Sequence, residues 1–291
     1  MITLITPTTG HPRLREAVRS VQRQTQPDIR HLVVIDGEAR RAAAEAILAE
    51  VNFTGQIMVV PEITGGEGFN GHLIYLTVPF LVKTEFVALL DEDNTFEPDH
   101  FSRLLSLCDE HRLDWAYSLR QVFADSGERL RDDCQSLGFW PAYAGAYHHI
   151  DTSCYFVRRE VWKRGIAVWD RPFKPEVRSP DQAFCGWLMH HYPRGYTSGH
   201  YTMNYWLGSN GSGGAEAEER RLDYFRVGNA VQAEVYRHFP WRYGVPGTDV
   251  PYGNMSVSCR DSQLARKFQS LVQDLRRPGE TSAVEKVVPP R

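Results

Sequence analysis

The stretch ITLITPTTGHPRLREAVRSVQRQTQPDIRHLVVIDG, Ile2–Gly37, contains the pattern of a strand, a helix and a second strand. Ile2–Thr6 is a short run of strand-favouring residues, and Arg13–Gln24 carries apolar residues at helical spacing. His31–Asp36 is a second apolar run, which the following glycine ends. This order is typical of a βαβ unit, in which the two strands lie parallel.

The same alternation continues through the first two fifths of the chain. The further elements that the pattern predicts are helices at Glu38–Val51 and Gly71–Lys83, a helix beginning at Pro98, and strands at Gln56–Val60, Glu85–Leu90 and Asp114–Leu119. Strands alternating with helices predict an α/β fold with a mainly parallel sheet and right-handed crossovers. In open sheets of this kind, ligands bind beyond the carboxyl ends of the strands. We therefore expect the functional site at that edge.

A second stretch, FVALLDEDNT at Phe86–Thr95, runs from an apolar strand directly into three acidic residues. Asp91 and Asp93 are two positions apart, so on an extended segment their side chains point the same way. Neighbouring carboxylates are costly to charge unless a cation lies between them, and Mg²⁺ and Mn²⁺ prefer oxygen ligands. The pattern predicts a metal that bridges the protein to a phosphate ligand, with a solvated turn as the alternative. Asp36 ends a parallel strand and is expected at the same edge.

Composition limits the class of protein. The formal net charge of −3 gives no basic surface for nucleic acid. The N-terminal residues lack the pattern of a signal peptide, and no apolar run reaches the length of a transmembrane segment. The five cysteines are scattered and never spaced as CxxC, which favours reduced thiols over a disulfide framework or a zinc site. We expect a cytoplasmic enzyme, with the oligomeric state open and a homodimer among the alternatives.

An ordered set of short motifs resembles the family 2 glycosyltransferases of the GT-A fold. The matching motifs are Pro7-Thr8, Ser20-Val21 followed by Gln24-Thr25, Ile35-Asp36-Gly37, and the DxD-bearing stretch EFVALLDEDNTFEPDHF at Glu85–Phe101. The resemblance covers residues 1–110 well and residues 150–190 more loosely. Two features depart from the family pattern: Ile-Asp-Gly replaces Asp-Asp-Gly, and no Arg-Asn precedes the DxD strand.

The resemblance implies a GT-A-like, Rossmann-type fold with a mixed, mostly parallel sheet flanked by helices and a C-terminal acceptor-side extension. Residues 1–120 would form the donor-binding half and residues 121–240 the acceptor-binding and catalytic half of one domain. Residues 241–291 would be a C-terminal extension with a partly disordered tail. The implied activity is transfer of a sugar from a nucleoside-diphosphate donor, UDP by default, to a hydroxyl of a small-molecule or glycan acceptor, with inversion.

The resemblance also implies roles for individual residues. The nucleotide-sugar-binding set would be Pro7, Thr8, Thr9, Asp36, Asp91, Glu92 and Asp93. Asp36 would accept a hydrogen bond from the base, with a strand-ending turn as the alternative. Asp91 would contact the ribose or a metal-bound water, and Asp93 would bind the Mn²⁺ or Mg²⁺ that bridges the diphosphate. His200 is a further candidate metal ligand on a late strand.

Sugar transfer to a hydroxyl also needs a group that accepts the proton, which an oriented carboxylate can do. In the family this base opens a late helix, and RSPDQAFCGWL places Asp181 there, after Pro180 at the first helical position. Asp181 also suits a helix N-terminus for purely structural reasons. Asp151 is the competing acidic residue and would contact acceptor or sugar. Trp140 and Tyr143 could form an apolar wall for a sugar ring or serve as core aromatics.

Two rival functions fit part of the same pattern. Asp91-x-Asp93-x-Thr95 after an apolar strand also resembles the nucleophile motif of haloacid-dehalogenase-like phosphatases, although that motif usually lies on the first strand. The other alternative is a nucleotide-sugar-binding protein without catalysis. The loop GSNGSGG, Gly208–Gly214, has the composition of a lid over bound donor or of a passive linker.

Overall fold

A computed structural model describes residues 1–207 except 67–68, 134–135, 137, 144, 171–178 and 193, and in addition residue 222; the side chains of 139–148 also lie outside the description. The helices are α1 (Leu14–Gln22), α2 (Arg41–Glu50), α3 (His72–Leu81), α4 (His100–His111), α5 (Arg159–Gly165) and α6 (Pro180–His191), with 3-10 turns η1 (Glu38–Arg40), η3 (Thr152–Cys154) and η4 (Ile166–Trp169). The strands are β1 (Ile2–Thr8), β2 (Ile29–Asp36), β3 (Gln56–Val60), β4 (Phe86–Leu89), β5 (Thr95–Phe96), β6 (Trp115–Ala124), β7 (Arg129–Asp132), β8 (Gly138–Tyr143), β9 (Gly145–His149), β10 (Tyr155–Arg158) and β11 (Gly195–Leu207).

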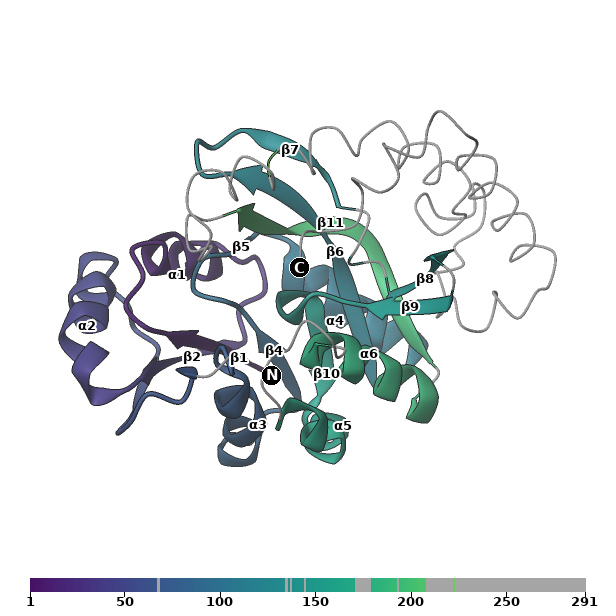
Figure 1. The fold of residues 1–291 in the computed structure, drawn as a ribbon, viewed down its shortest axis with the longest axis horizontal. Coiled ribbons are helices and arrows are strands. Elements are labelled where there is room, and N and C mark those ends of the chain that lie inside the picture. Colours follow the sequence, from purple (N-terminus) through teal and green to yellow (C-terminus); the bar gives the residue numbers. More distant parts are fainter. Residues whose placement is uncertain are drawn as a thin grey trace.

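Within the described residues, nine strands form one mixed sheet in the order β3-β2-β1-β4-β10-β6-β11-β5, with β7 paired to β6. β1 runs parallel to both β2 and β4, β2 runs parallel to β3, and β6 runs parallel to β11. β10 is inserted between β4 and β6 and is antiparallel to both. The predicted α/β fold with a mostly parallel sheet is confirmed, and Figure 1 shows the helices packed around this sheet.

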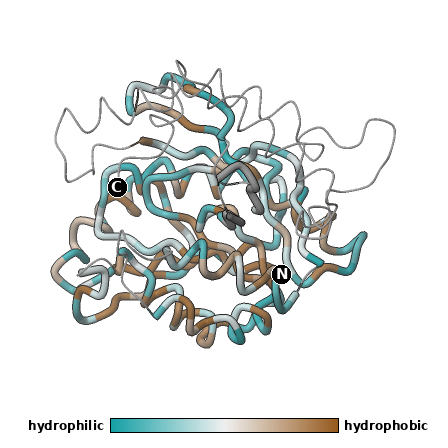
Figure 2. Tube along the Cα trace, turned by 45° about the vertical axis from the view of Figure 1, so that its right-hand side comes forward, coloured by the Kyte–Doolittle hydropathy of each residue, from teal (hydrophilic) through white to brown (hydrophobic). Residues whose placement is uncertain are grey.

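Helices cover both faces of the N-terminal strands because side chains alternate along a strand. Val33 and Ile35 of β2 pack with α1 and α2, while Leu32 and Val34 belong to the larger core on the other face. That larger core includes aromatic side chains of α5, η4 and α6. Along the chain, hydrophobic and hydrophilic segments alternate, as the brown and teal parts of the tube in Figure 2 show.

The largest differences from the predicted elements lie after the fourth strand. β6 extends to Ala124, beyond the predicted end at Leu119, because Val122 and Ala124 are buried where β6 pairs with β11. The hairpin β8–β9 forms a separate two-stranded sheet. Among the described residues, no helix combines the length and apolarity needed to cross a bilayer. The predicted C-terminal extension, 241–291, and the loop Gly208–Gly214 lie outside the described residues.

Candidate active site

A cavity of about 570 Å³ lies beyond the carboxyl ends of β1, β2 and β4. It is lined by the whole predicted nucleotide-sugar-binding set, Pro7, Thr8, Thr9, Asp36, Asp91, Glu92 and Asp93. Parallel pairing of β1 with β2 and with β4 brings these residues together, because parallel strands present their carboxyl ends at one edge. As the strand pattern predicts, motifs that are distant in the sequence lie together at this edge of the sheet.

The acidic residues lie in a turn, Asp91–Asn94, which we call the acidic turn. The Asn94 N–H donates to the Asp91 carbonyl oxygen at 3.1 Å, so the segment is not extended as the sequence suggested. Asp91 and Asp93 nevertheless both reach the cavity. The second half of the turn is anchored elsewhere, since the Trp206 N–H donates to Asn94 Oδ1 at 3.2 Å.

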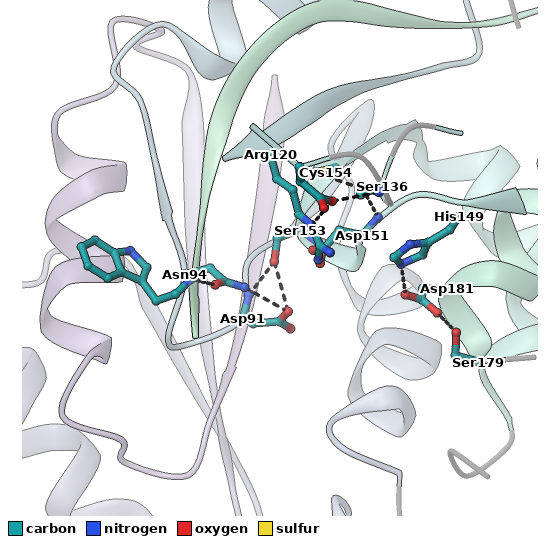
Figure 3. Close-up of polar contacts among 12 residues, drawn as sticks. Asp91, Asn94, Arg120, Ser136, His149, Asp151, Ser153, Cys154, Ser179 and Asp181 are labelled. Atoms are coloured by element: carbon teal, nitrogen blue, oxygen red, sulfur yellow. Dashed lines mark hydrogen bonds and ion pairs between the residues drawn. The ribbon is translucent and has the colours of Figure 1, made fainter. Parts of the chain in front are cut away.

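Both carboxylate oxygens of Asp91 accept hydrogen bonds from the protein. The Tyr75 hydroxyl donates to Oδ1. The Ser153 hydroxyl donates to Oδ2 at 3.2 Å, as Figure 3 shows. Ser153 Oγ also accepts from the Asp91 N–H at 3.0 Å. Burial raises the pKa of Asp91 to about 7, and the Asp151 and Asp93 carboxylates add to the rise against these hydrogen bonds. These hydrogen bonds fix the Asp91 side chain at the cavity wall. Its raised pKa means that ionising the carboxyl group there is costly.

The carboxyl group of Asp93 is also costly to ionise. Its pKa is raised, first by burial and then by the neighbouring Glu92 carboxylate. A divalent cation between Asp91 and Asp93 would remove the cost of charging both groups, so the donor set fits Mg²⁺ or Mn²⁺. In the described part of the chain, no three His, Cys, Asp or Glu side chains form a metal cluster. Two carboxylates match the way Mg²⁺ is held together with substrate phosphates.

Glu92 points into the loop that follows β1, Thr8–His11, which we call the β1 loop. Its carboxylate accepts from the Thr8 hydroxyl, from the Thr9 N–H at 3.1 Å and hydroxyl at 2.8 Å, and from the His11 N–H at 2.9 Å. These oxygens are therefore engaged with protein donors, although the sequence placed Glu92 with the residues that bind the nucleotide sugar directly.

Asp36 ends β2 and holds the loop that follows β3. Oδ1 accepts from the Thr64 N–H at 2.7 Å and hydroxyl at 2.8 Å, and Oδ2 accepts from the Gly65 N–H at 2.8 Å. A Cβ at Gly65 would lie 2.9 Å from Asp36 Oδ2, so a larger residue would push this contact apart. Asp36 lines the cavity and also has the alternative role considered from the sequence, that of an anchor for a turn.

Asp151 is differently placed from the prediction. Its carboxylate pairs with the buried Arg120 guanidinium, which also contacts Asp133 at 2.6 Å. Asp151 Oδ1 accepts from the Ser153 N–H at 2.9 Å and so caps η3. Burial alone would lower the pKa of Arg120, but the two carboxylates raise it well above its ordinary value. Asp151 is thus a buried ion-pair residue, and its neighbour Thr152 lines the cavity instead.

Asp181 lies in the first turn of α6, as the sequence predicts. Its carboxylate is 3.0 Å from His149 Nε2 and accepts from the Ser179 hydroxyl (Figure 3). It also accepts from the Gln182 N–H at 2.8 Å. Burial tends to raise the pKa of Asp181, but the attraction of His149 and these hydrogen bonds outweigh it, so the pKa is lowered. Asp181 is therefore a carboxylate that is ionised at neutral pH.

His200 does not join the acidic turn. It lines a different, shallow pocket with Arg103 and Ser198, and its Nε2 lies 3.0 Å from Arg103 Nη1. Burial and the Arg103 charge lower the pKa of His200. A guanidinium at this distance disfavours a bound cation, and the structure does not bring His200 together with Asp91 and Asp93, which line the other cavity. For Trp140 and Tyr143 the backbone lies in β8, and their side chains fall outside the described residues.

Several cavity residues were missed by sequence reasoning. They are Ile63, Gly65, Gly66, Asn70, Gly71, His72, Tyr75, Asn94, Thr152 and Tyr205. Most belong to the glycine-rich segment ITGGEGFNGH between β3 and α3, whose density of glycines was an available signal. Tyr75 carried no such signal, because an aromatic residue on an apolar helix reads as core.

Comparison with known proteins bears on this arrangement. The crystal structure of S. aureus TarS 1-349 in complex with UDP-GlcNAc is similar with a TM-score of 0.52 at 16% identity, over 98% of this chain and 88% of that chain. The mannosyltransferase PcManGT from Pyrobaculum calidifontis, in complex with GDP-Man and Mn2+, gives 0.50 at 15% identity, over 99% and 86%. A search among curated proteins gives no significant match. At these identities the structural likeness concerns the fold alone.

The mixed sheet and its flanking helices have the GT-A fold, with the cavity at the strand ends. The sequence model of glycosyl transferase family 2 matches residues 3–145. Over this part of the sequence the chain is a family 2-like glycosyltransferase. The match decides against the haloacid-dehalogenase-like phosphatase, in agreement with the position of Asp91 after the fourth strand of the chain.

Proposed function

We propose that the protein is a metal-dependent glycosyltransferase that moves a sugar from a nucleoside-diphosphate donor to an acceptor hydroxyl with inversion. The observation that carries this proposal is the cavity at the ends of β1, β2 and β4, where the β1 loop, Asp36 and the acidic turn meet. UDP is the favoured nucleotide, and the solved relatives that bind UDP-GlcNAc or GDP-Man support a nucleotide sugar in general.

In this proposal Asp91 and Asp93 hold Mg²⁺ or Mn²⁺, and the raised pKa of each supports a cation at this place. The metal would stabilise the negative charge of the leaving diphosphate. Tyr75 and Ser153 orient the Asp91 carboxylate through their hydroxyl groups. Asp36 also lines the cavity and is the proposed acceptor of a hydrogen bond from the nucleotide base.

Asp181 is the proposed general base. A carboxylate that is ionised at neutral pH can accept the proton of the acceptor hydroxyl at one of its oxygens. His149 and Ser179 orient it, and its place in the first turn of α6 favours the negative charge. The proposal assigns residues 1–120 to the donor and 121–240 to a small-molecule or glycan acceptor. A cytoplasmic location stays a prediction from the sequence.

A thermal-shift screen tests the donor assignment. UDP, GDP, CDP and dTDP are each added with Mn²⁺ and with a chelator. A ligand at 100 times its dissociation constant stabilises the folded state by about 2.7 kcal/mol. We expect one nucleotide, with UDP favoured, to raise the melting temperature when Mn²⁺ is present and to lose most of that effect with the chelator.

The donor assignment fails if no nucleotide stabilises the protein in either condition. Equal stabilisation with and without Mn²⁺ would support nucleotide binding but contradict a metal dependence of that binding. A nucleotide-sugar-binding protein without catalysis would pass this screen, so the stabilising nucleotide sugar is then incubated with an acceptor panel. Release of the free nucleoside diphosphate with a glycosylated product distinguishes the transferase from a binder.

A further inference from the structure

Glu92 occupies the middle of the acidic turn but serves a different surface from its two acidic neighbours. Asp91 and Asp93 line the cavity, and burial is the main cause of the raised pKa of each, whereas the Glu92 carboxylate is turned toward the β1 loop. Both of its oxygens accept from that loop: Oε1 from Thr9, and Oε2 from Thr8, Thr9 and His11. The two segments are more than 80 positions apart in the sequence.

The bonds to Glu92 use up the donors of the β1 loop. The N–H groups of Thr9 and His11 donate to the carboxylate, and the Gly10 N–H donates to Thr8 Oγ1 at 3.0 Å. Successive backbone N–H groups in a loop after a strand are a common way to bind an anion. Here the anion is already supplied by the chain, because a carboxylate takes the place that a phosphate group would otherwise fill.

We propose that Glu92 is a positioning residue that fills the β1 loop as an internal anion and fastens it to the acidic turn. The β1 loop is then a preset wall of the donor cavity that offers no backbone donors to the phosphates. The diphosphate is directed to the side of Asp91 and Asp93. This inference rests on the proposed function for the identity of the ligand, but the clamp itself is a property of the free protein.

Charge-assisted hydrogen bonds from backbone N–H groups are the strong kind, so their loss has a measurable effect. In Glu92→Gln one acceptor oxygen is replaced by an amide donor that faces other donors. Amide hydrogen exchange of the free protein reports the clamp directly. We expect the Thr9 and His11 amides to exchange about 10- to 100-fold faster in the variant. Glu50→Gln is the matched control, since Glu50 pairs with Arg15 on the surface, away from the cavity.

The second readout is affinity for UDP and GDP, titrated with Mn²⁺ present. We expect the dissociation constant of the better nucleotide to rise about tenfold or more in Glu92→Gln, with kcat at saturating donor within about threefold of wild type. Glu92→Asp keeps the charge with a shorter reach and should restore part of the affinity. A residue that only stabilised the fold would give neither the split between affinity and kcat nor this partial restoration.

The outcomes separate the inference from the proposed function. If wild type binds no nucleotide, the proposed function fails and amide exchange alone decides the clamp. Unchanged exchange at Thr9 and His11 in Glu92→Gln overturns the clamp. Unchanged nucleotide affinity, or a fall in kcat as large as the loss of affinity, overturns its positioning role. If Glu92→Gln does not fold, Glu92→Asp is measured in the same two ways and judged by the same outcomes.

Discussion

At the scale of single residues, the acidic side chains of this site differ by what surrounds them. Asp91 and Asp93 have a raised pKa because burial and like charges oppose ionisation. Asp181 has a lowered pKa because His149 and two hydrogen-bond donors outweigh its burial. Groups whose environments push their pKa values apart are suited to different tasks, which in the proposed function are cation binding for the pair and proton acceptance for Asp181.

The role of Asp181 can be tested by removing its charge. Asp181→Asn keeps the shape of the side chain but cannot accept the acceptor's proton. We expect turnover to fall on the order of 10² to 10⁴-fold with nucleotide affinity unchanged. Steady-state kinetics and nucleotide titration provide the two measurements. Asp99→Asn, which breaks an exposed ion pair with Arg103, is the control. Activity above a few percent of wild type would remove Asp181 from the mechanism.

Single residues were predictable where a strand end fixed them. Asp36 and Asp91 follow apolar runs, so parallel pairing alone brought them to one edge. The partners of these residues were not predictable. The contact of Glu92 with the β1 loop depends on the path of that loop, and the pairing of Asp151 with Arg120 joins residues 31 positions apart through burial. Neither contact can be predicted from the periodicity of apolar residues in the sequence.

At the scale of elements, η3 holds the acidic turn through Ser153. Asp151 caps η3, and Ser153 within it both accepts from and donates to Asp91 (Figure 3). The strands and helices up to β4 were predicted from their periodicity, whereas η3, the two-residue strand β5 and the hairpin β8–β9 were not. Such short elements have too few residues for a period and are held by tertiary contacts.

Loss of the Ser153 hydroxyl should therefore loosen the end of β4. In Ser153→Ala the Asp91 N–H and one carboxylate oxygen lose a partner, which we expect to cost about 1–3 kcal/mol of unfolding free energy. Urea denaturation measures this change. Ser20→Ala is the matched control, because Ser20 is equally buried but its hydroxyl donates to the Ala17 carbonyl oxygen of its own helix. Equal losses of unfolding free energy in the two variants would show that the contact with Asp91 contributes no more to stability than the hydrogen bond of Ser20 within its helix.

At the scale of the whole molecule, the interior contains histidines that stay neutral. Burial lowers the pKa of both His31 and His100 to about 3. In the unfolded chain these histidines take up protons as the pH falls below their ordinary pKa near 6.5. In the folded protein they take up protons only near pH 3. Between pH 6.5 and pH 3 the protein therefore takes up protons when it unfolds. Each of these histidines makes the folded state less stable as the pH falls through this range.

His31→Gln should make that pH dependence shallower. The Gln amide can replace the contact of His31 Nε2 with Thr6 Oγ1, which is 2.9 Å long, without titrating. We expect the slope of unfolding free energy against pH to fall by up to about 1.4 kcal/mol per pH unit between pH 4 and 6. Chemical denaturation at several pH values measures it, with His190→Gln at an exposed position as the control. An unchanged slope would contradict a neutral, buried His31.

The insertion of β10 between β4 and β6 has a consequence for the order in which the nascent chain can mature. β4 is a central strand only after Tyr155–Arg158 has been added beside it, and η3 reaches Asp91 from the same late segment. While the ribosome is still synthesising the segment that the family shares, residues 3–145, the strand behind the acidic turn has an unpaired edge. The acidic turn therefore gains its contact with η3 only after the segment beyond residue 145 has been synthesised.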